Sequence, residues 1–229
     1  MIAPAPVDVE GALIAGGAAL LPGFLAADEC AALRACYDRD ALFRSRIVMD
    51  RHRFGRGEYR YFAYPLPPSV ERLRRDVYEL LHAPANAWME RLGSAERFPA
   101  ELSALLARCG AGGQSRPTPL LLKYGAGDFN CLHQDVYGDI AFPLQAAIFL
   151  SAPGSDYTGG EFVLAESRPR SQTRVEVFTP GRGDMLVFPN RYRPIAGTRG
   201  VYRAAVRHGV SSVRSGERFT LGLIFHDAL

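Results

Sequence analysis

Lysine, cysteine and long apolar runs are scarce in this chain of 229 residues. Lys123 is the only lysine among 27 basic residues, and the net charge of +3 permits an anionic partner without requiring one. The four cysteines form no Cys-x-x-Cys pair and no zinc-like spacing, so we expect reduced thiols. No segment reaches the roughly 18 to 20 uninterrupted apolar residues of a membrane helix, and the apolar stretch 12–27 lacks the basic start of a signal peptide. These absences predict a cytoplasmic protein without a membrane partner.

The residues that are present suit a globular fold. Apolar residues make up 48% of the chain and charged residues 22%, which is enough for a sizeable core and excludes disordered and fibrous classes. The length favours a single domain spanning residues 1–229. Apolar residues recur at helical spacing in the first part, residues 1–117, and Pro84 is expected to break or kink the second of three helices there. The helices are expected at 28–37, 69–81 and 99–109.

Residues 118–229 have a different pattern, of short β-type runs separated by turn residues. Seven or eight short strands at this spacing are typical of a sandwich or barrel. We therefore expect an α+β fold that is mainly β. The N-terminal helices should pack on one face of the sheet, because their apolar sides need a partner. The strands are expected at 120–124, 145–150, 160–164, 174–178, 185–188, 203–210 and 219–225.

A histidine and a carboxylate two residues apart form the first candidate site. In the segment Leu132-His133-Gln134-Asp135, the strand period of two would place His133 and Asp135 on one face. An imidazole nitrogen and a carboxylate oxygen suit Fe(II), and one further histidine would complete a facial triad with open positions. By composition, about half of one such His-x-Asp or His-x-Glu match arises by chance in a chain of this length. The alternative is a strand-end pair that is hydrogen-bonded at a turn.

A second segment offers a third ligand and an anion-binding group. Two β-type runs flank Ser215-Gly216, which predicts a hairpin with His208 on one strand and Arg218 on the next. Arginine can hold a carboxylate through two parallel hydrogen bonds and stays charged in a partly buried pocket. A two-residue turn would place these two side chains on opposite faces, so we predict an odd loop or a bulge. The alternatives are a half-buried histidine and a surface arginine.

These residues together resemble a known family. The run Tyr124-Gly125-Ala126-Gly127, followed by the His-x-Asp pair, the distal histidine and the arginine, resembles the Fe(II)- and 2-oxoglutarate-dependent dioxygenases, in particular their prolyl-hydroxylase-like branch. The resemblance covers residues 118–229 and implies that they form a double-stranded β-helix, or jelly roll, as the catalytic core. It implies Fe(II), 2-oxoglutarate and O2 as cofactors. The implied catalytic metal ligands are His133, Asp135 and His208, and the implied 2-oxoglutarate-binding residues are Arg218 and Tyr124.

Residues 43–62 mix arginine with aromatic residues. Such a mixture can hold a phosphate backbone and stack on an extruded base. Gly55 and Gly57 favour a loop, consistent with a lid over the iron site. The alternative is a solvated loop whose arginines pair with nearby carboxylates. Glu161 is a weaker candidate for a substrate contact, and His52, His82 and His226 are expected at the surface or behind the metal ligands. The candidate substrate residues are Arg53, Arg56, Tyr59 and Tyr61.

The segment 53–62 and the terminal Phe225-His226-Asp227 also resemble a bacterial group of these dioxygenases that is proposed to act on damaged nucleic acid. This resemblance implies oxidative dealkylation of DNA or RNA, in which the attached carbon is hydroxylated and leaves as an aldehyde. Two alternatives stay open. One is a hydroxylase of protein side chains or free amino acids, and the other is a non-catalytic scaffold that binds nucleic acid or another partner through the arginine-rich segment. The sequence leaves the oligomeric state open.

Overall fold

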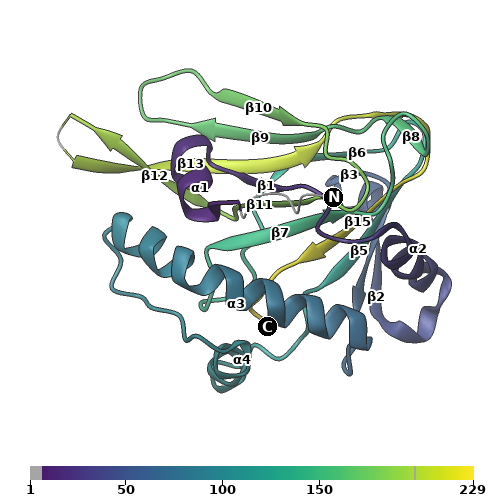
Figure 1. The fold of residues 1–229 in the computed structure, drawn as a ribbon, viewed down its shortest axis with the longest axis horizontal. Coiled ribbons are helices and arrows are strands. Elements are labelled where there is room, and N and C mark those ends of the chain that lie inside the picture. The colour runs from purple at the N-terminus through teal and green to yellow at the C-terminus, as the bar shows by residue number, and fades with distance from the viewer. Residues whose placement is uncertain (1–6, 199) are drawn as a thin grey trace.

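The computed structural model describes residues 7–198 and 200–229. Two antiparallel sheets lie one above the other, and two of the helices, at residues 68–91 and 102–111, lie below the lower sheet (Figure 1). A seven-stranded sheet has the order β1-β11-β7-β15-β5-β4-β2. A six-stranded sheet has the order β10-β9-β13-β6-β3, with β12 paired to β13, and β8 pairs with β14 separately. The architecture confirms the expected α+β, mainly β fold with a jelly-roll core.

The elements have the following bounds. The helices are α1 (Val9–Gly16), α2 (Ala27–Ala35), α3 (Pro68–Arg91) and α4 (Leu102–Ala111), with short 3-10 turns η1 (Cys36–Asp38), η2 (Asp40–Leu42) and η3 (Met49–His52). The strands are β1 (Ala19–Leu21), β2 (Phe43–Val48), β3 (Gly55–Arg56), β4 (Glu58–Phe62), β5 (Leu120–Tyr124), β6 (Phe129–His133), β7 (Leu144–Phe149), β8 (Tyr157–Gly159), β9 (Phe162–Ser167), β10 (Arg174–Phe178), β11 (Met185–Pro189), β12 (Tyr192–Gly197), β13 (Gly200–Val210), β14 (Val213–Gly216) and β15 (Arg218–Leu223).

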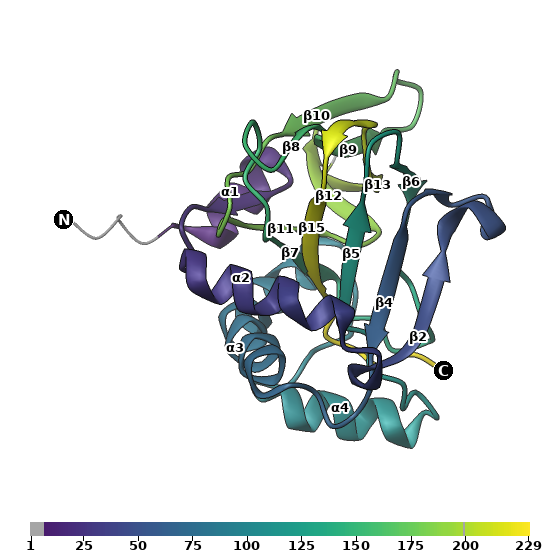
Figure 2. The same ribbon diagram turned by 90° about the vertical axis from the view of Figure 1, so that its right-hand side faces the viewer.

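The helices cover the outer face of the seven-stranded sheet, as expected (Figure 2). Leu73, Val77 and Leu81 recur at helical spacing on α3 and share one buried cluster with Ile148 of β7. The next residue of β7, Phe149, belongs to a second cluster with residues of the six-stranded sheet, because side chains alternate across a strand. The inner faces of the two sheets therefore enclose the space in which a site can form.

The expected break at Pro84 is wrong, because α3 continues through it to Arg91. A proline inside a helix costs about 3 kcal/mol. The carbonyl that loses its donor belongs to Leu80, which is 43% exposed, so water can satisfy it. Beyond the proline, Ala85 and Trp88 are buried, and the indole N–H of Trp88 donates to the carbonyl of Tyr192 at 2.9 Å. These tertiary contacts hold the last two turns of the helix in place.

The arginine-rich segment is not the predicted loop. It forms β2 and β4, which pair with each other and extend the seven-stranded sheet at β5, while η3 and β3 lie between them. Outward positions carry Arg46 and Arg60, which make ion pairs with Glu58 and Asp40. A strand whose outer face carries charged residues resembles a polar loop in sequence. Its alternation of inward and outward residues is therefore not recognised from the sequence.

The predicted hairpin between His208 and Arg218 is also wrong. His208 lies on β13 of the six-stranded sheet and Arg218 on β15 of the seven-stranded sheet, while the intervening β14 pairs with β8. The chain thus crosses from one sheet to the other. Because the two sheets face each other, both side chains point inward without the odd loop that a hairpin would need. Among residues 7–198 and 200–229, no helix has the length and apolarity needed to cross a membrane.

Candidate active site

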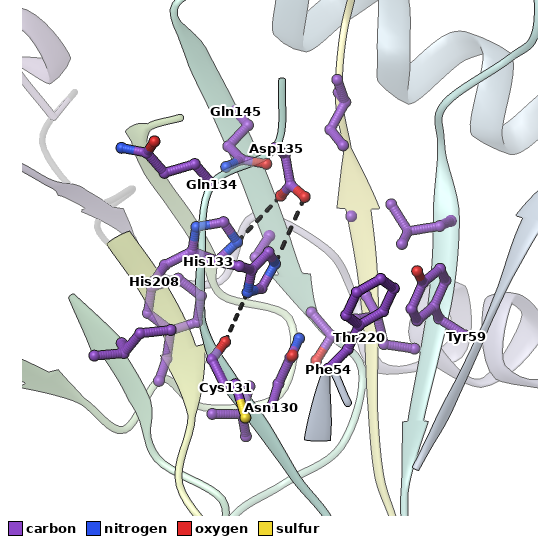
Figure 3. A pocket seen from close by; sticks show the side chains of 18 of the residues that line it. Phe54, Tyr59, Asn130, Cys131, His133, Gln134, Asp135, Gln145, His208 and Thr220 are labelled. Atoms are coloured by element: carbon purple, nitrogen blue, oxygen red, sulfur yellow. Dashed lines mark hydrogen bonds and ion pairs between the residues drawn. The ribbon is translucent and has the colours of Figure 1, made fainter. Parts of the chain in front are cut away.

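Two histidines and an aspartate meet between the sheets. His133 ends β6, and His208 lies opposite it in the register of β13. Asp135 lies in the loop, two residues beyond the end of β6, and its carboxylate lies beside both imidazole rings (Figure 3). Asp135 Oδ2 lies 3.1 Å from His208 Nε2, and Oδ1 lies 3.5 Å from His133 Nε2. One ligand atom from each residue lies within 4.8 Å of the others.

The surroundings of these side chains favour the protonation states that bind a metal. Burial raises the pKa of Asp135, but the hydrogen bond and charge of His208 outweigh it and hold that pKa below its usual range. Burial, followed by the charge of His133, lowers the pKa of His208. The carbonyl of Cys131 lies 2.8 Å from His133 Nδ1, which assigns the proton to Nδ1 and leaves Nε2 free to coordinate. An ionised carboxylate and neutral imidazoles are the forms in which aspartate and histidine bind a metal ion.

The donor set fits an octahedral metal ion. Metal–ligand bonds of about 2.1 Å would place neighbouring ligand atoms about 3.0 Å apart. The 3.1 Å between Asp135 Oδ2 and His208 Nε2 is close to this value, and one ligand atom of His133 lies within 4.8 Å of the other two ligands. Two imidazoles and one carboxylate form the facial triad of Fe(II) oxygenases, although the same atoms also accept other divalent transition metals. Fe(II) is therefore compatible with the residues present.

Arg218 lies in the same cavity and has unused hydrogen-bond donors. Its side chain is 1% exposed, and its Nη1 donates to Thr220 Oγ1 at 2.8 Å. Nε and Nη2, the two donors on one edge of the guanidinium, are buried without a partner among the described residues. The rings of Tyr124, Phe149 and Tyr157 lie 5.3 to 6.0 Å from its central carbon, and no carboxylate of the described chain pairs with it. A buried cation in this state is a site for an anionic ligand.

Tyr124 is the register partner of Arg218 and is fully buried. Burial raises the pKa of Tyr124 above its usual range, so its hydroxyl stays protonated and can donate a hydrogen bond. Asn130, which stands on β6, donates to this hydroxyl at 3.3 Å. The structure thus places the three predicted metal ligands, Arg218 and Tyr124 around one cavity.

The cavity has a volume of about 350 Å³, within the range of small-molecule sites. Tyr59 and Tyr61 form part of its wall, and Arg53 lies on its rim. Arg56 does not line it. Among the weaker candidates, Glu161 bonds to Ser211 instead of facing the cavity.

The remaining histidines lie away from the metal cluster. His52 stacks on Phe54 at the cavity rim, and His82 contacts the carbonyl of Glu79 on α3. His226 is fully buried, and its Nδ1 accepts a hydrogen bond from the backbone N–H of Phe142. Burial, and then the charge of Arg74, lowers the pKa of His226 to about 4, so the ring is neutral. None of the three supplies a ligand.

Two residues that line the cavity were not predicted from the sequence. Gln145 is the one polar residue in the otherwise apolar β7, and its Nε2 is buried without a partner among the described residues. A single amide inside a fully buried strand is a signal that could have identified it. Tyr137 bonds to Asp135 and follows it by two residues, but nothing in the sequence distinguishes it from other tyrosines near turns.

Comparison with known proteins agrees with this geometry. Residues 57–228 match the family model Oxygenase-NA, described as an oxygenase catalysing oxidative methylation of damaged DNA. The chain belongs to this family. Two uncharacterized proteins of Mycobacterium tuberculosis, from strains CDC 1551 / Oshkosh and H37Rv, are each 49% identical over 167 residues, or 73% of this chain and 72% of theirs.

Solved structures with a similar fold include a Pseudomonas putida prolyl-4-hydroxylase, with a TM-score of 0.58 and 19% identity over 96% of this chain and 98% of that one. A Burkholderia pseudomallei oxidoreductase of the 2OG-Fe(II) oxygenase family has a TM-score of 0.56 and 20% identity over 96% and 91%. These likenesses confirm the jelly-roll fold. The Oxygenase-NA chain is therefore an oxygenase, and hence an oxidoreductase, as predicted, and its cluster of two histidines and one carboxylate fits the predicted Fe(II).

Proposed function

We propose that the protein oxidatively removes alkyl groups from nucleic-acid bases. The observation that carries this proposal is a single cavity that holds a two-histidine, one-carboxylate cluster and a buried guanidinium with two unused donors. In this proposal His133, Asp135 and His208 hold the iron. Arg218 binds the distal carboxylate of 2-oxoglutarate through Nε and Nη2, and the Tyr124 hydroxyl donates to the same molecule.

The protein positions the reactants and keeps water out. When bound, iron with 2-oxoglutarate and O2 inserts one oxygen atom into a C–H bond, while the other oxygen atom goes to succinate and CO2 is released. If the oxidised carbon is a methyl group on a base nitrogen, the hydroxymethyl product breaks its C–N bond. The nitrogen keeps the hydroxyl proton and formaldehyde leaves. Phe162 and Phe188 pack against the His208 ring and keep that side of the site dry.

The mouth of the cavity fits a base next to a phosphate backbone. Phe54 is 48% exposed, and its ring stacks on His52 with centroids 5.3 Å apart. Its backbone is fixed on both sides, since its N–H donates to Met49 and its carbonyl accepts from Cys131. Arg53 and Arg56, beside it, make no ion pair within the described chain. An exposed, rigid aromatic face between free cations matches the way proteins bind unstacked bases.

The proposal assigns a different role to each part of the chain. We assign residues 1–229 to one dioxygenase domain, in which residues 118–229 carry the iron and cosubstrate groups. Residues 1–117 supply the covering helices, and their strand β4 contributes Tyr59 to the cavity wall.

A cosubstrate-turnover screen tests the proposed substrate. Succinate release from 2-oxoglutarate should rise with methylated oligonucleotides and stay at background with proline-containing peptides and free amino acids. Stimulation by peptides or amino acids alone would favour the amino-acid hydroxylase instead. His133→Ala supplies the background rate.

Without O2, Fe(II) and 2-oxoglutarate should give the wild-type protein a weak visible metal-to-ligand absorption that the His133→Ala variant lacks. A wild-type spectrum without this absorption would contradict the metal centre.

Two variants of the mouth should weaken oligonucleotide binding in different ways. Phe54→Ala should raise the Kd for a single-stranded oligonucleotide about 10-fold, because stacking contributes about 1–3 kcal/mol per base. Arg53→Ala should instead make the negative slope of log K against log salt shallower by about 0.7, the value for one lost phosphate contact on a single strand. Fluorescence anisotropy at several salt concentrations measures both quantities.

Arg182→Ala is the matched control, since Arg182 is exposed in the turn before β11 and does not line the cavity. If both mouth variants kept the wild-type Kd and salt slope, the nucleic-acid mouth would have to be abandoned.

A further inference from the structure

One oxygen of the Asp135 carboxylate is already occupied by a protein group. The hydroxyl of Tyr137 donates to Asp135 Oδ1 at 2.5 Å. The other oxygen, Oδ2, lies 3.1 Å from His208 Nε2, at the separation expected of neighbouring metal ligands. The two oxygens therefore have different surroundings: Oδ1, which also lies 3.5 Å from His133 Nε2, accepts the hydrogen bond of Tyr137, while Oδ2 faces His208.

Tyr137 is itself held in place by a second tyrosine. The hydroxyl of Tyr61 donates to the hydroxyl of Tyr137 at 3.2 Å, which directs the Tyr137 proton toward Asp135. The guanidinium of Arg44 lies 4.5 Å from the centre of the Tyr61 ring, and Arg44 Nε donates to the carbonyl of Pro117 at 3.0 Å. A continuous set of contacts thus runs from β2 through β4 to the carboxylate.

The orientation of this carboxylate decides how many metal positions stay open. A facial triad leaves three positions, of which a 2-oxo acid chelate takes two and O2 takes one. A carboxylate that turns and binds through both oxygens would fill one of them. A hydrogen bond to one oxygen opposes that turn, and partners of this kind typically change metal affinity or activity 10- to 100-fold.

We propose that Tyr137, oriented by Tyr61, is a positioning residue that holds Asp135 to coordination through Oδ2 alone. The inference rests on the proposed metal centre but not on the proposed substrate. It also gives Tyr61 a different role from the substrate contact that its position in the arginine-rich segment predicted, because its hydroxyl is engaged with Tyr137.

Tyr137→Phe tests the proposal, since it removes the hydroxyl and keeps the ring. Isothermal titration with Co(II) under exclusion of O2 should give a Kd raised 10- to 100-fold. At saturating Co(II), the visible d–d spectrum should also change, because a second carboxylate oxygen alters the coordination number. Tyr61→Phe should raise the Kd less, since it removes the support of Tyr137 and leaves the bond to Asp135. Loss of packing alone would not alter the spectrum of the saturated site.

Tyr202→Phe is the control, because Tyr202 lies on β13, does not line the cavity and makes no hydrogen bond to Tyr137, Tyr61 or Asp135. A wild-type Kd or a wild-type Co(II) spectrum in Tyr137→Phe would overturn the proposal, as would an equal rise of the Kd in Tyr202→Phe. Failure of the wild-type protein to bind Co(II) is a distinguishable result, since it would overturn the metal centre of the proposed function as well.

Discussion

Arg218→Met should make the protein without metal and cosubstrate at least as stable as the wild type, while it removes most of the stabilisation that 2-oxoglutarate confers. In the wild type, a guanidinium that is 1% exposed keeps two donors without partners, which is costly in the absence of an anion. Methionine replaces the charge with a flexible apolar chain among the rings of Tyr124, Phe149 and Tyr157. We expect the free energy of unfolding to rise by about 1 kcal/mol, since exchanging buried charges for apolar groups is often stabilising.

The effect on the liganded protein has the opposite sign. A cosubstrate present at about 100 times its Kd stabilises the wild type by about 2.7 kcal/mol. Removing one partner of a buried, hydrogen-bonded charge pair costs about 2–5 kcal/mol, so the Kd for 2-oxoglutarate should rise at least about 30-fold. Thermal unfolding of the Mn(II)-loaded protein with and without 2-oxoglutarate measures this difference.

Arg214→Met is the control for this experiment, since Arg214 is exposed on the neighbouring strand β14. It should leave both the unfolding temperature and the shift caused by 2-oxoglutarate unchanged. A less stable Arg218→Met protein that still responds to 2-oxoglutarate would show that this arginine is structural and that the cosubstrate binds elsewhere.

Arg74→Met should be the most destabilising single change, with a loss of about 3–5 kcal/mol in the free energy of unfolding. Arg74 of α3 is 1% exposed, and its Nη2 donates to Asp227 Oδ1 at 2.8 Å and to the carbonyl of Phe225 at 2.9 Å. Without it, the hydroxyl of Tyr64 is the one hydrogen-bond partner that the buried carboxylate of Asp227 keeps among the described residues. For a chain of this length the melting temperature should fall by about 10 °C.

The neighbouring residue Arg72 on the same helix provides the matched control. Its ion pair with Glu29, at 3.0 Å, is exposed to solvent, so Arg72→Met should change the free energy of unfolding by less than about 1 kcal/mol. The double variant Arg74→Met, Asp227→Leu should recover part of the loss, because it removes both charges together. Equal melting temperatures for the Arg74 and Arg72 variants would contradict the assigned importance of the buried pair.

The sequence predicted those parts of the fold that depend on a single local pattern. The sequence predicts seven strands of residues 118–229, because turn residues separate their short β-type runs, and it predicts α3 from Leu73, Val77 and Leu81. It misses β6, β8, β12 and β14. Pro84 misled the prediction of its end, since the contacts of Trp88 that hold the last turns come from β12, more than a hundred residues away. Local propensity carries no information about such contacts.

In the candidate site, too, some features could be predicted from the sequence and others could not. The residues at His133, Asp135, His208 and Arg218 could be identified because their types and order match one chemistry. Their geometry could not, since the hairpin assumed for His208 and Arg218 is in fact a crossing between sheets. Tyr137 is recognisable only from the hydrogen bond that the folded loop creates.

The pairing of β4 with β5 limits how this enzyme could be shortened or recombined. β4 brings Tyr59 and Tyr61 to the cavity and covers the edge of β5, while β3 from the same early segment pairs with β6, which ends at the metal ligand His133. A fragment that starts at residue 118 would expose both strand edges and open the reaction chamber to bulk water. When residues 118–229 are exchanged between relatives, we therefore expect active chimaeras only if residues 43–62 come from the same parent as residues 118–229.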